Sequence, residues 1–223
     1  FGTPLAGAVF ALEVIVVGRL RYDAILPVFI SSFFAHITCH AWGIAHTHYS
    51  ITQTPELNIQ TLLTVLAASI IFGLAAMVFS RLIGTWGNLA KKYISYPPLR
   101  PFVGGIFIAL SVYLIGNTKY IGLGVPTIVA SFSEVQMWYD PLMKILLTTF
   151  TIGVGFKGGE VTPLFFVGAT LGSALSAILP LHVSILAGLG FVAVFAGATN
   201  TPIACTLMGI ELFGADAAVY IGI

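Results

Sequence analysis

The segment 155–163 reads GFKGGEVTP and places charge and glycine in a region that is otherwise almost uncharged. Its Thr-Pro pair predicts a helix start, because proline at the first helical position lacks an N–H that would have no partner there anyway. The free amides of such a start face the positive end of the helix dipole, and neighbouring glycines let a ligand approach closely. The chemistry that fits is weak anion binding by backbone N–H groups. The candidate anion-binding residues are Gly158, Gly159, Glu160, Val161 and Thr162. Glycines that only permit close helix packing are an equally weighted alternative.

Two further carboxylates, Glu13 and Glu211, lie in apolar stretches. Ionisable residues within membrane segments are often functional, so Glu13 and Glu160 are candidates for a role in proton coupling. Glu13 and Glu211 both fall at expected helix ends, however, where a carboxylate can reach the interface or cap a neighbouring helix. We favour this structural interpretation for both.

The histidines and cysteines give weaker signals. His36 and His40 stand four residues apart on one expected helix, but no third metal ligand is evident and Cys39 points elsewhere on the turn. Cys39 and Cys205 each lie in an apolar run, where cysteine usually behaves as a small buried hydrophobe. We therefore predict no metal site, no disulfide and no cofactor.

Composition places the chain in the lipid bilayer. It is 58% hydrophobic and 8% charged, with a mean hydropathy of +1.02, whereas soluble proteins are about 25% charged. Nine Lys and Arg against eight Asp and Glu give a net charge of +1, which offers no basic surface for nucleic acid. The expected partners are lipid, another membrane subunit or a small permeant species. The chain opens at Phe1 without Met and stops in an apolar run, so we expect it to be part of a longer protein.

The hydrophobic pattern predicts an all-α integral membrane protein. Residues 24–45 and 57–89 are long enough to cross a hydrocarbon core of ~30 Å. Shorter helices are predicted at 4–17, 102–115, from 126, 141–153, 163–178, 183–195 and 202–213, with another beginning at 215. Half-length helices interrupted by Gly and Pro are typical of channels and transporters. Their starts share a cap residue followed by proline: Thr3-Pro4, Asp140-Pro141, Thr162-Pro163 and Thr201-Pro202.

Orientation and an internal repeat follow from the same map. Basic residues gather in the connections 18–23 and 81–100, which the positive-inside rule assigns to the cytoplasm, and the connection with His46 and His48 lies outside. In both the 3–13 and the 201–211 segments, a Thr-Pro pair is followed by a glutamate ten residues after the threonine. Such recurrence indicates the structural repeats of transporters.

Three motifs resemble the CLC family of chloride channels and anion/proton antiporters. Residues 159–163 (GEVTP) resemble its G-x-F-x-P anion-binding motif, and residues 1–13 resemble its N-A-P-L-A-G-x-x-F-x-x-E segment. Residues 198–211 are similar to its later A-P-L-T-G…E segment. The three occur in the family's order along essentially the whole chain.

The resemblance implies an inverted-repeat fold, incomplete at both ends, with 1–56 closing the first repeat and 57–223 forming most of the second. It also implies transport of chloride or another halide, as a channel or an anion/proton exchanger, in a multi-pass protein of the cell membrane. A homodimer would form through the helices at 4–17, 24–45, 202–213 and from 215. Chloride or fluoride, with protons, would be the transported species.

The chain also departs from the family pattern. Val161 replaces the usual aromatic residue, and Glu160 resembles the variant of the fluoride/proton antiporter branch, which is our alternative function. Glu13-Val14 stands where proton-coupled members often carry Glu-Glu, and the family's gating glutamate, serine and tyrosine positions fall outside residues 1–223. Two other classes remain as weaker hypotheses: a membrane-embedded enzyme using His36 and His40, and a membrane scaffold.

Overall fold

The computed structural model describes residues 2–15 and 22–223, and the regular elements in these ranges are helices, which confirms the predicted all-α class. Phe1, Arg19, Arg21 and the predicted end of the first helix at 16–17 lie outside the described residues. In chain order the α-helices are α1 (Pro4–Glu13), α2 (Ile25–Ala41), α3 (Ile59–Tyr93), α4 (Leu99–Ile115), α5 (Val125–Ala130), α6 (Asp140–Gly153), α7 (Val161–Leu175), α8 (Val183–Thr199), α9 (Pro202–Phe213) and α10 (Ala218–Ile221).

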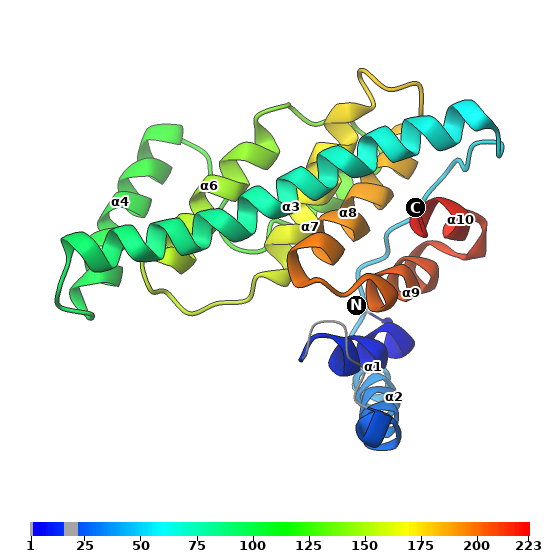
Figure 1. The fold of residues 1–223 in the computed structure, drawn as a ribbon, viewed down its shortest axis with the longest axis horizontal. Coiled ribbons are helices and arrows are strands. Elements are labelled where there is room, and N and C mark those ends of the chain that lie inside the picture. Colours follow the sequence, from blue (N-terminus) through cyan, green and yellow to red (C-terminus); the bar gives the residue numbers. More distant parts are fainter. Residues whose placement is uncertain (1, 16–21) are drawn as a thin grey trace.

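Helix α3 runs along the long axis of the molecule and packs against α6, α7 and α8 (Figure 1). It begins where the Asn58 side chain accepts a hydrogen bond from the Thr61 N–H at 2.8 Å. Lys91 and Lys92 lie in its last turn, where cations interact favourably with the helix dipole. At 1.5 Å per residue, its 35 residues span about 52 Å, which exceeds the ~30 Å hydrocarbon core. A helix of this length can cross the bilayer at a tilt or extend beyond the hydrocarbon core.

The core forms where α7 and α8 cross at very short range. A Cβ atom on Gly168 would lie 2.1 Å from the carbonyl oxygen of Gly190, so only glycine allows the two backbones to approach this closely. The Phe165 and Phe191 rings stack beside the crossing, with centroids 3.9 Å apart. Small residues at the crossing and aromatic rings around it are the usual way in which membrane helices gain packing energy. The crossing fixes the position of α7, whose first turn is the candidate site.

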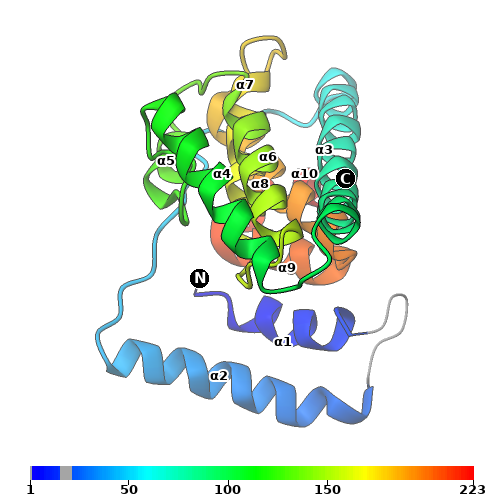
Figure 2. The same ribbon diagram turned by 90° about the vertical axis from the view of Figure 1, so that its left-hand side faces the viewer.

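Helices α1 and α2 lie outside this core, beneath the bundle (Figure 2). Helix α1 packs between α9 and α2, and α2 contacts α1 while most of its apolar surface is exposed; Leu26 and Phe34 are 71% and 65% exposed. By length and composition, the described segments Tyr22–Ala41 and Ile59–Tyr93 can cross a membrane. The remaining helices are shorter, as predicted, and several are strongly apolar.

Several predicted helix boundaries were wrong. Helix α7 begins at Val161, two residues earlier than predicted, so Thr162 lies inside the helix and does not cap it. Helix α2 ends at Ala41 rather than at 45. Helix α3 ends at Tyr93 rather than at 89, because its last turn continues through polar residues until the Ile94 N–H donates to the Ala90 carbonyl oxygen. The helix predicted from 215 is a 3-10 turn followed by the single turn of α10.

The predicted side-chain caps were also wrong. Thr3 and Thr201 occupy the N-cap positions of α1 and α9, with proline next, but neither hydroxyl makes a capping hydrogen bond. Asp140 is the first residue of α6 and Tyr139 is its N-cap. In α1 and α9 the amides are bound instead by distant carboxylates, which are described below.

Candidate functional site

The first turn of α7 presents backbone amides next to an exposed glycine-rich loop. Glu160 is the N-cap residue, and its side chain makes no capping hydrogen bond. The first helical hydrogen bond runs from the Leu164 N–H to the Glu160 carbonyl at 3.1 Å. The N–H groups of Val161 and Thr162 come before that bond and therefore have no partner within the helix. Gly158, Gly159 and Glu160 are exposed, and from Pro163 onward the helix is buried.

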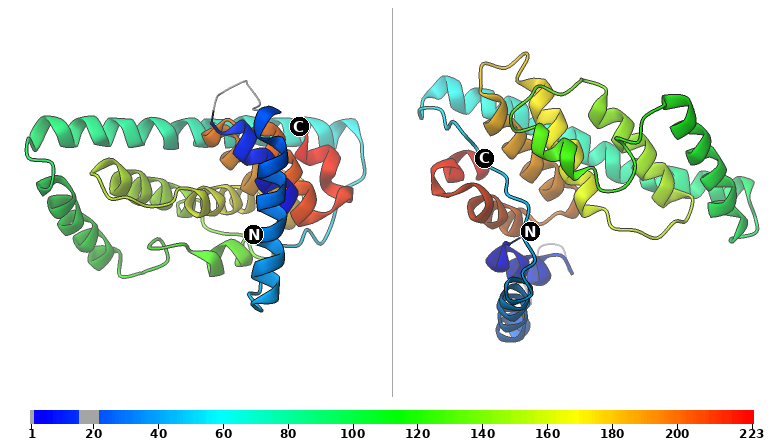
Figure 3. Two further views of the ribbon diagram at one scale, coloured as in Figure 1. Left: turned by 90° about the horizontal axis from the view of Figure 1, so that it is seen from below. Right: turned by 180° about the vertical axis from the view of Figure 1, so that it is seen from behind.

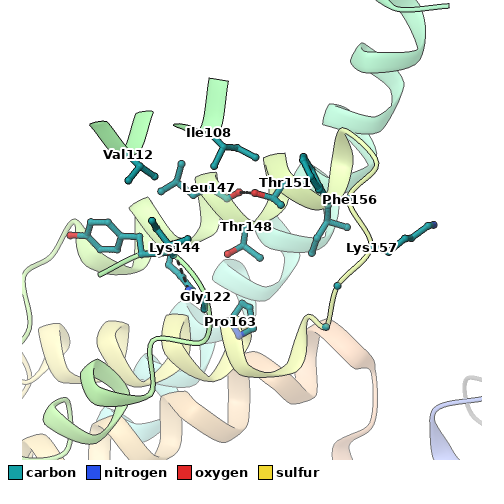
Figure 4. A pocket seen from close by; sticks show the side chains of 15 residues that line it. Ile108, Val112, Gly122, Lys144, Leu147, Thr148, Thr151, Phe156, Lys157 and Pro163 are labelled. Atoms are coloured by element: carbon teal, nitrogen blue, oxygen red, sulfur yellow. Dashed lines mark hydrogen bonds between the residues drawn. The ribbon is translucent and has the colours of Figure 1, made fainter. Parts of the chain in front are cut away.

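Two cavities adjoin this turn. One has a volume of about 210 Å³ and is lined by Gly158, Gly159 and Pro163 together with residues of α4 and α6 (Figure 4). The other has a volume of about 190 Å³ and reaches Val161 from the side of α1 and α9. Of the predicted residues, Gly158 and Gly159 therefore line the first cavity and Val161 lines the second, whereas Glu160 and Thr162 line neither of the two. Lys157, which precedes them, also lines the first cavity, and its side chain points away from the other labelled lining residues (Figure 4).

A buried lysine on α6 was missed by the sequence analysis. Lys144 is 1% exposed, and its ammonium group donates hydrogen bonds to the carbonyl oxygens of Gly122 at 2.7 Å and Tyr120 at 3.1 Å. It also lies 4.9 Å from the centroid of the Phe166 ring. The side chain lines the larger cavity (Figure 4), so it places a positive charge near the start of α7. A lone lysine in the apolar run of 141–153 was the available signal, because charged residues in such helices are rare and usually functional.

A second polar cluster holds the segment that Lys144 binds. Asp140 is 1% exposed and accepts hydrogen bonds from the Tyr120 hydroxyl at 2.6 Å, the Lys119 ammonium at 2.7 Å and the Met137 N–H at 3.1 Å. A buried carboxylate with three donors, one of them charged, is well satisfied. Together, Asp140 and Lys144 fix residues 119–122 against α6 and so form one wall of the larger cavity.

Glu13 and Glu211 cap each other's helices. Glu13, at the end of α1, accepts hydrogen bonds from the N–H groups of Ala204 at 2.8 Å and Ile203 at 3.2 Å at the start of α9. Glu211, near the end of α9, accepts hydrogen bonds from the N–H groups at the start of α1, from Ala6 at 2.8 Å and Leu5 at 3.0 Å. Both carboxylates therefore complement a helix dipole. The structural interpretation left two roles open, reaching the interface or capping a neighbouring helix, and the observed contacts are those of a cap.

The histidine pair on α2 lies next to a third histidine, His46, in the segment that follows the helix. The His36 ring stacks on His46 with centroids 5.8 Å apart. Within residues 2–15 and 22–223, no group of three or more His, Cys, Asp or Glu side chains is placed to hold a metal ion. Cys39 is a free thiol of intermediate exposure, and Cys205 is free and buried.

The arrangement defines a class of membrane protein. Several of its helices are short for crossing a bilayer alone. Helix α7 starts beside two cavities, its first amides have no partner within the helix, and the buried Lys144 ammonium lies nearby. Helix starts at membrane depth that line cavities are how channels and transporters hold small ions. The fold and the site thus have the features of a membrane channel or transporter.

Comparison with known proteins gives the family. The family described as "Voltage gated chloride channel" matches residues 1–223. A chloride/fluoride channel protein of Pseudomonas syringae pv. tomato is 49% identical over 98% of this chain and 50% of its own length. The voltage-gated ClC-type chloride channel ClcB of Salmonella typhimurium is 28% identical over 96% of this chain and 54% of its own. The crystal structure of a CLC-type fluoride/proton antiporter superposes with a TM-score of 0.95 and 35% identity, covering all of this chain and 56% of that one.

The chain belongs to the voltage-gated chloride channel (CLC) family of integral membrane proteins. The resemblance seen in the three sequence motifs and the predicted CLC-type fold are both confirmed. The chain spans about half the length of the relatives it matches.

Proposed function

We propose that the full-length protein moves halide anions across the membrane along a pathway that includes the first turn of α7. The observation that carries this proposal is the position of the Val161 and Thr162 amides, which precede the first hydrogen bond of the helix at a turn whose residues border two cavities. Partial positive charge at such a start can replace part of an anion's hydration shell without a full countercharge. The anion is therefore held weakly enough to leave again.

Fluoride is the anion we favour, with exchange for protons, and chloride is the alternative. Relatives named a chloride/fluoride channel protein and a fluoride/proton antiporter match the chain at 49% and 35% identity. The residues agree with this choice, because a small, strongly hydrated anion needs many hydrogen-bond donors. The Thr162 hydroxyl and a protonated Glu160 carboxyl can supply donors beside the amides. Glu160 is also the candidate coupling residue, since it can carry a proton at the anion site.

The test is anion flux from liposomes that contain the purified full-length protein. Glu160→Gln keeps the size of the side chain and replaces the carboxyl group with an amide. We expect fluoride flux or its proton coupling to fall about tenfold or more, the size of effect expected when a group in direct contact with the transported species is lost. Glu134→Gln is the matched control, because Glu134 is an exposed carboxylate near the opposite end of α7, where its backbone carbonyl accepts a hydrogen bond from the Ser173 hydroxyl. Fluoride flux and coupling that are unchanged in Glu160→Gln would refute the role of this residue, and chloride flux measured in parallel separates the two anions.

We further propose that residues 1–56 end a first repeat and that 57–223 form most of a second, inverted one. The reciprocal capping of α1 and α9 supports this division, because a two-fold relation between the two helices produces such an exchange of contacts. A homodimer in the cell membrane through α1, α2, α9 and α10 would cover the exposed apolar surface of α2. Ile37→Trp on α2 should lower the dimer fraction in crosslinking experiments, whereas Phe102→Trp on α4 should not. Equal dimer fractions would count against this interface.

A further inference from the structure

A groove lies between the end of α3 and the neighbouring helix α4, and its lining residues are distinct from those of the two cavities at the start of α7. The two helices diverge after the turn that joins them, and α6 lies between them (Figure 3). The groove has a volume of about 370 Å³; its walls are formed by Trp86, Ala90 and Tyr93 of α3 and Val103 and Phe107 of α4, with Phe150 of α6 as part of the floor. Contact of Gly104 with the Val154 side chain closes the floor where α4 meets α6.

The walls of the groove suit a hydrocarbon chain. Apart from Arg100, they are built from apolar and aromatic side chains. The Trp86 ring meets Phe150 edge to face at 5.3 Å, so the inner end is a packed aromatic surface. Leu89 and Phe107 remain 43% and 57% exposed. Apolar surface of this kind is stabilised by an acyl chain and offers nothing to a hydrated ion.

The mouth of the groove is cationic. The Arg100 guanidinium lines it and donates to the carbonyl oxygens of Ile94 at 2.9 Å and Ser95 at 3.3 Å, which orients the group and uses two of its five N–H donors. The Lys92 ammonium lies 5.8 Å from the ring centroid of Tyr93, which is itself a wall residue. These charges stand beside exposed Tyr93, and tyrosine is enriched where transmembrane helices meet lipid headgroups.

We propose that this groove binds an anionic phospholipid, with its phosphate near Arg100 and Lys92 and one acyl chain between α3 and α4. The combination of a basic rim with an apolar slot between transmembrane helices matches the chemistry of such lipids and not that of a free phosphate. Lys92 and Arg100 flank the turn 94–98 between α3 and α4, in the basic stretch that the positive-inside rule places at the cytoplasmic leaflet, where anionic lipids are enriched. The inference is independent of which anion the protein transports.

The experiment measures lipid retention by the full-length protein in detergent, using native mass spectrometry with phosphatidylglycerol or phosphatidylcholine of the same acyl composition. We expect wild type to retain phosphatidylglycerol preferentially. Arg100→Gln and Lys92→Gln should each weaken that retention about fivefold, because one Lys or Arg near an anionic surface contributes on the order of 1 kcal/mol. Arg81→Gln is the matched control, since Arg81 is an exposed cation on α3 outside the groove.

Ala90→Trp tests the acyl slot separately, because the added ring fills the groove without changing the charge. It should reduce retention of phosphatidylglycerol to the level of phosphatidylcholine. Lys92→Gln keeps the proposal testable if Arg100→Gln fails to fold, because the Lys92 side chain is exposed. Equal retention of the two lipids by wild type would overturn the proposal. Full retention in Ala90→Trp would do the same, since another part of the full-length chain would then fill the groove.

Discussion

Removal of the Glu13 carboxylate should strongly destabilise the contact between α1 and α9. In Glu13→Ala, the amides of Ala204 and Ile203 lose an acceptor at 2.8 and 3.2 Å, in a place where the carboxylate is only 9% exposed. A hydrogen bond to a charged group contributes about 1.5–3 kcal/mol, and a buried donor left without a partner costs about 1–3 kcal/mol. Since one of the two bonds is long, we expect the free energy of unfolding to fall by about 3 kcal/mol.

Two related variants set the scale of that loss. Glu211→Ala should cost less, about 1–2 kcal/mol, because Glu211 is more exposed than Glu13 and solvent can replace part of the interaction. Glu13→Gln keeps one acceptor oxygen and should cost about half as much as Glu13→Ala. The double variant should deviate from additivity, since both carboxylates stabilise one helix pair.

The assay is reversible unfolding of the purified full-length protein in mixed detergent micelles, with Glu56→Ala as the control at an exposed carboxylate. A Glu13→Ala variant no less stable than Glu56→Ala would refute the capping argument. The same variants separate stability from transport. If Glu13 also serves proton coupling, Glu13→Gln should lose coupling while it keeps most of its stability.

Two further predictions concern packing and the buried lysine. Gly168→Ala should lower the free energy of unfolding by at least about 3 kcal/mol in the same assay, because the new Cβ would lie 2.1 Å from the Gly190 carbonyl oxygen. Gly84→Ala on α3 is the control: its Cβ meets nothing within 4 Å, so the change should be neutral or slightly stabilising. Equal effects of the two substitutions would contradict the close crossing of α7 and α8. Lys144→Met leaves two carbonyl oxygens without their charged donor and should lower the free energy of unfolding by about 2–3 kcal/mol, while Lys157→Met at an exposed site should not. A stable Lys144→Met protein would show that these bonds contribute little.

The sequence predicted the helices well where composition alone decides their existence. Residues 57–89 and 202–213 were predicted as helices, and the structure has α3 at Ile59–Tyr93 and α9 at Pro202–Phe213. The predicted caps failed where distant groups satisfy the first amides of a helix. The Thr201 hydroxyl has the right place and chemistry to cap α9, yet the cap is Glu13, 190 residues away in the chain. Only the packing of α1 on α9 brings that carboxylate into reach.

The candidate site divides in the same way. Glycines followed by Thr-Pro indicate a helix start directly from local chemistry, and α7 does begin in that segment, at Val161. The place of Lys144 beside this turn depends on how the segment 119–122 folds back over α6, which no local pattern encodes. Lys157 is the cation nearest in sequence to the start of α7, and it also lines the cavity, but its side chain points away from the other labelled lining residues.

Anion binding at the start of α7 depends most directly on the N–H group of Val161, and one measurement tests that group by itself. Replacing Val161 by its α-hydroxy acid in the full-length protein turns the amide into an ester, which removes the N–H and leaves every side chain in place. We predict that fluoride flux into liposomes, or chloride flux if chloride is the substrate, falls about tenfold, since removal of one oriented donor from an anion site costs at least about 1.4 kcal/mol. The same ester placed at Val129 on α5 should leave flux unchanged. Wild-type flux of both anions through the Val161 ester would contradict anion binding at the start of α7.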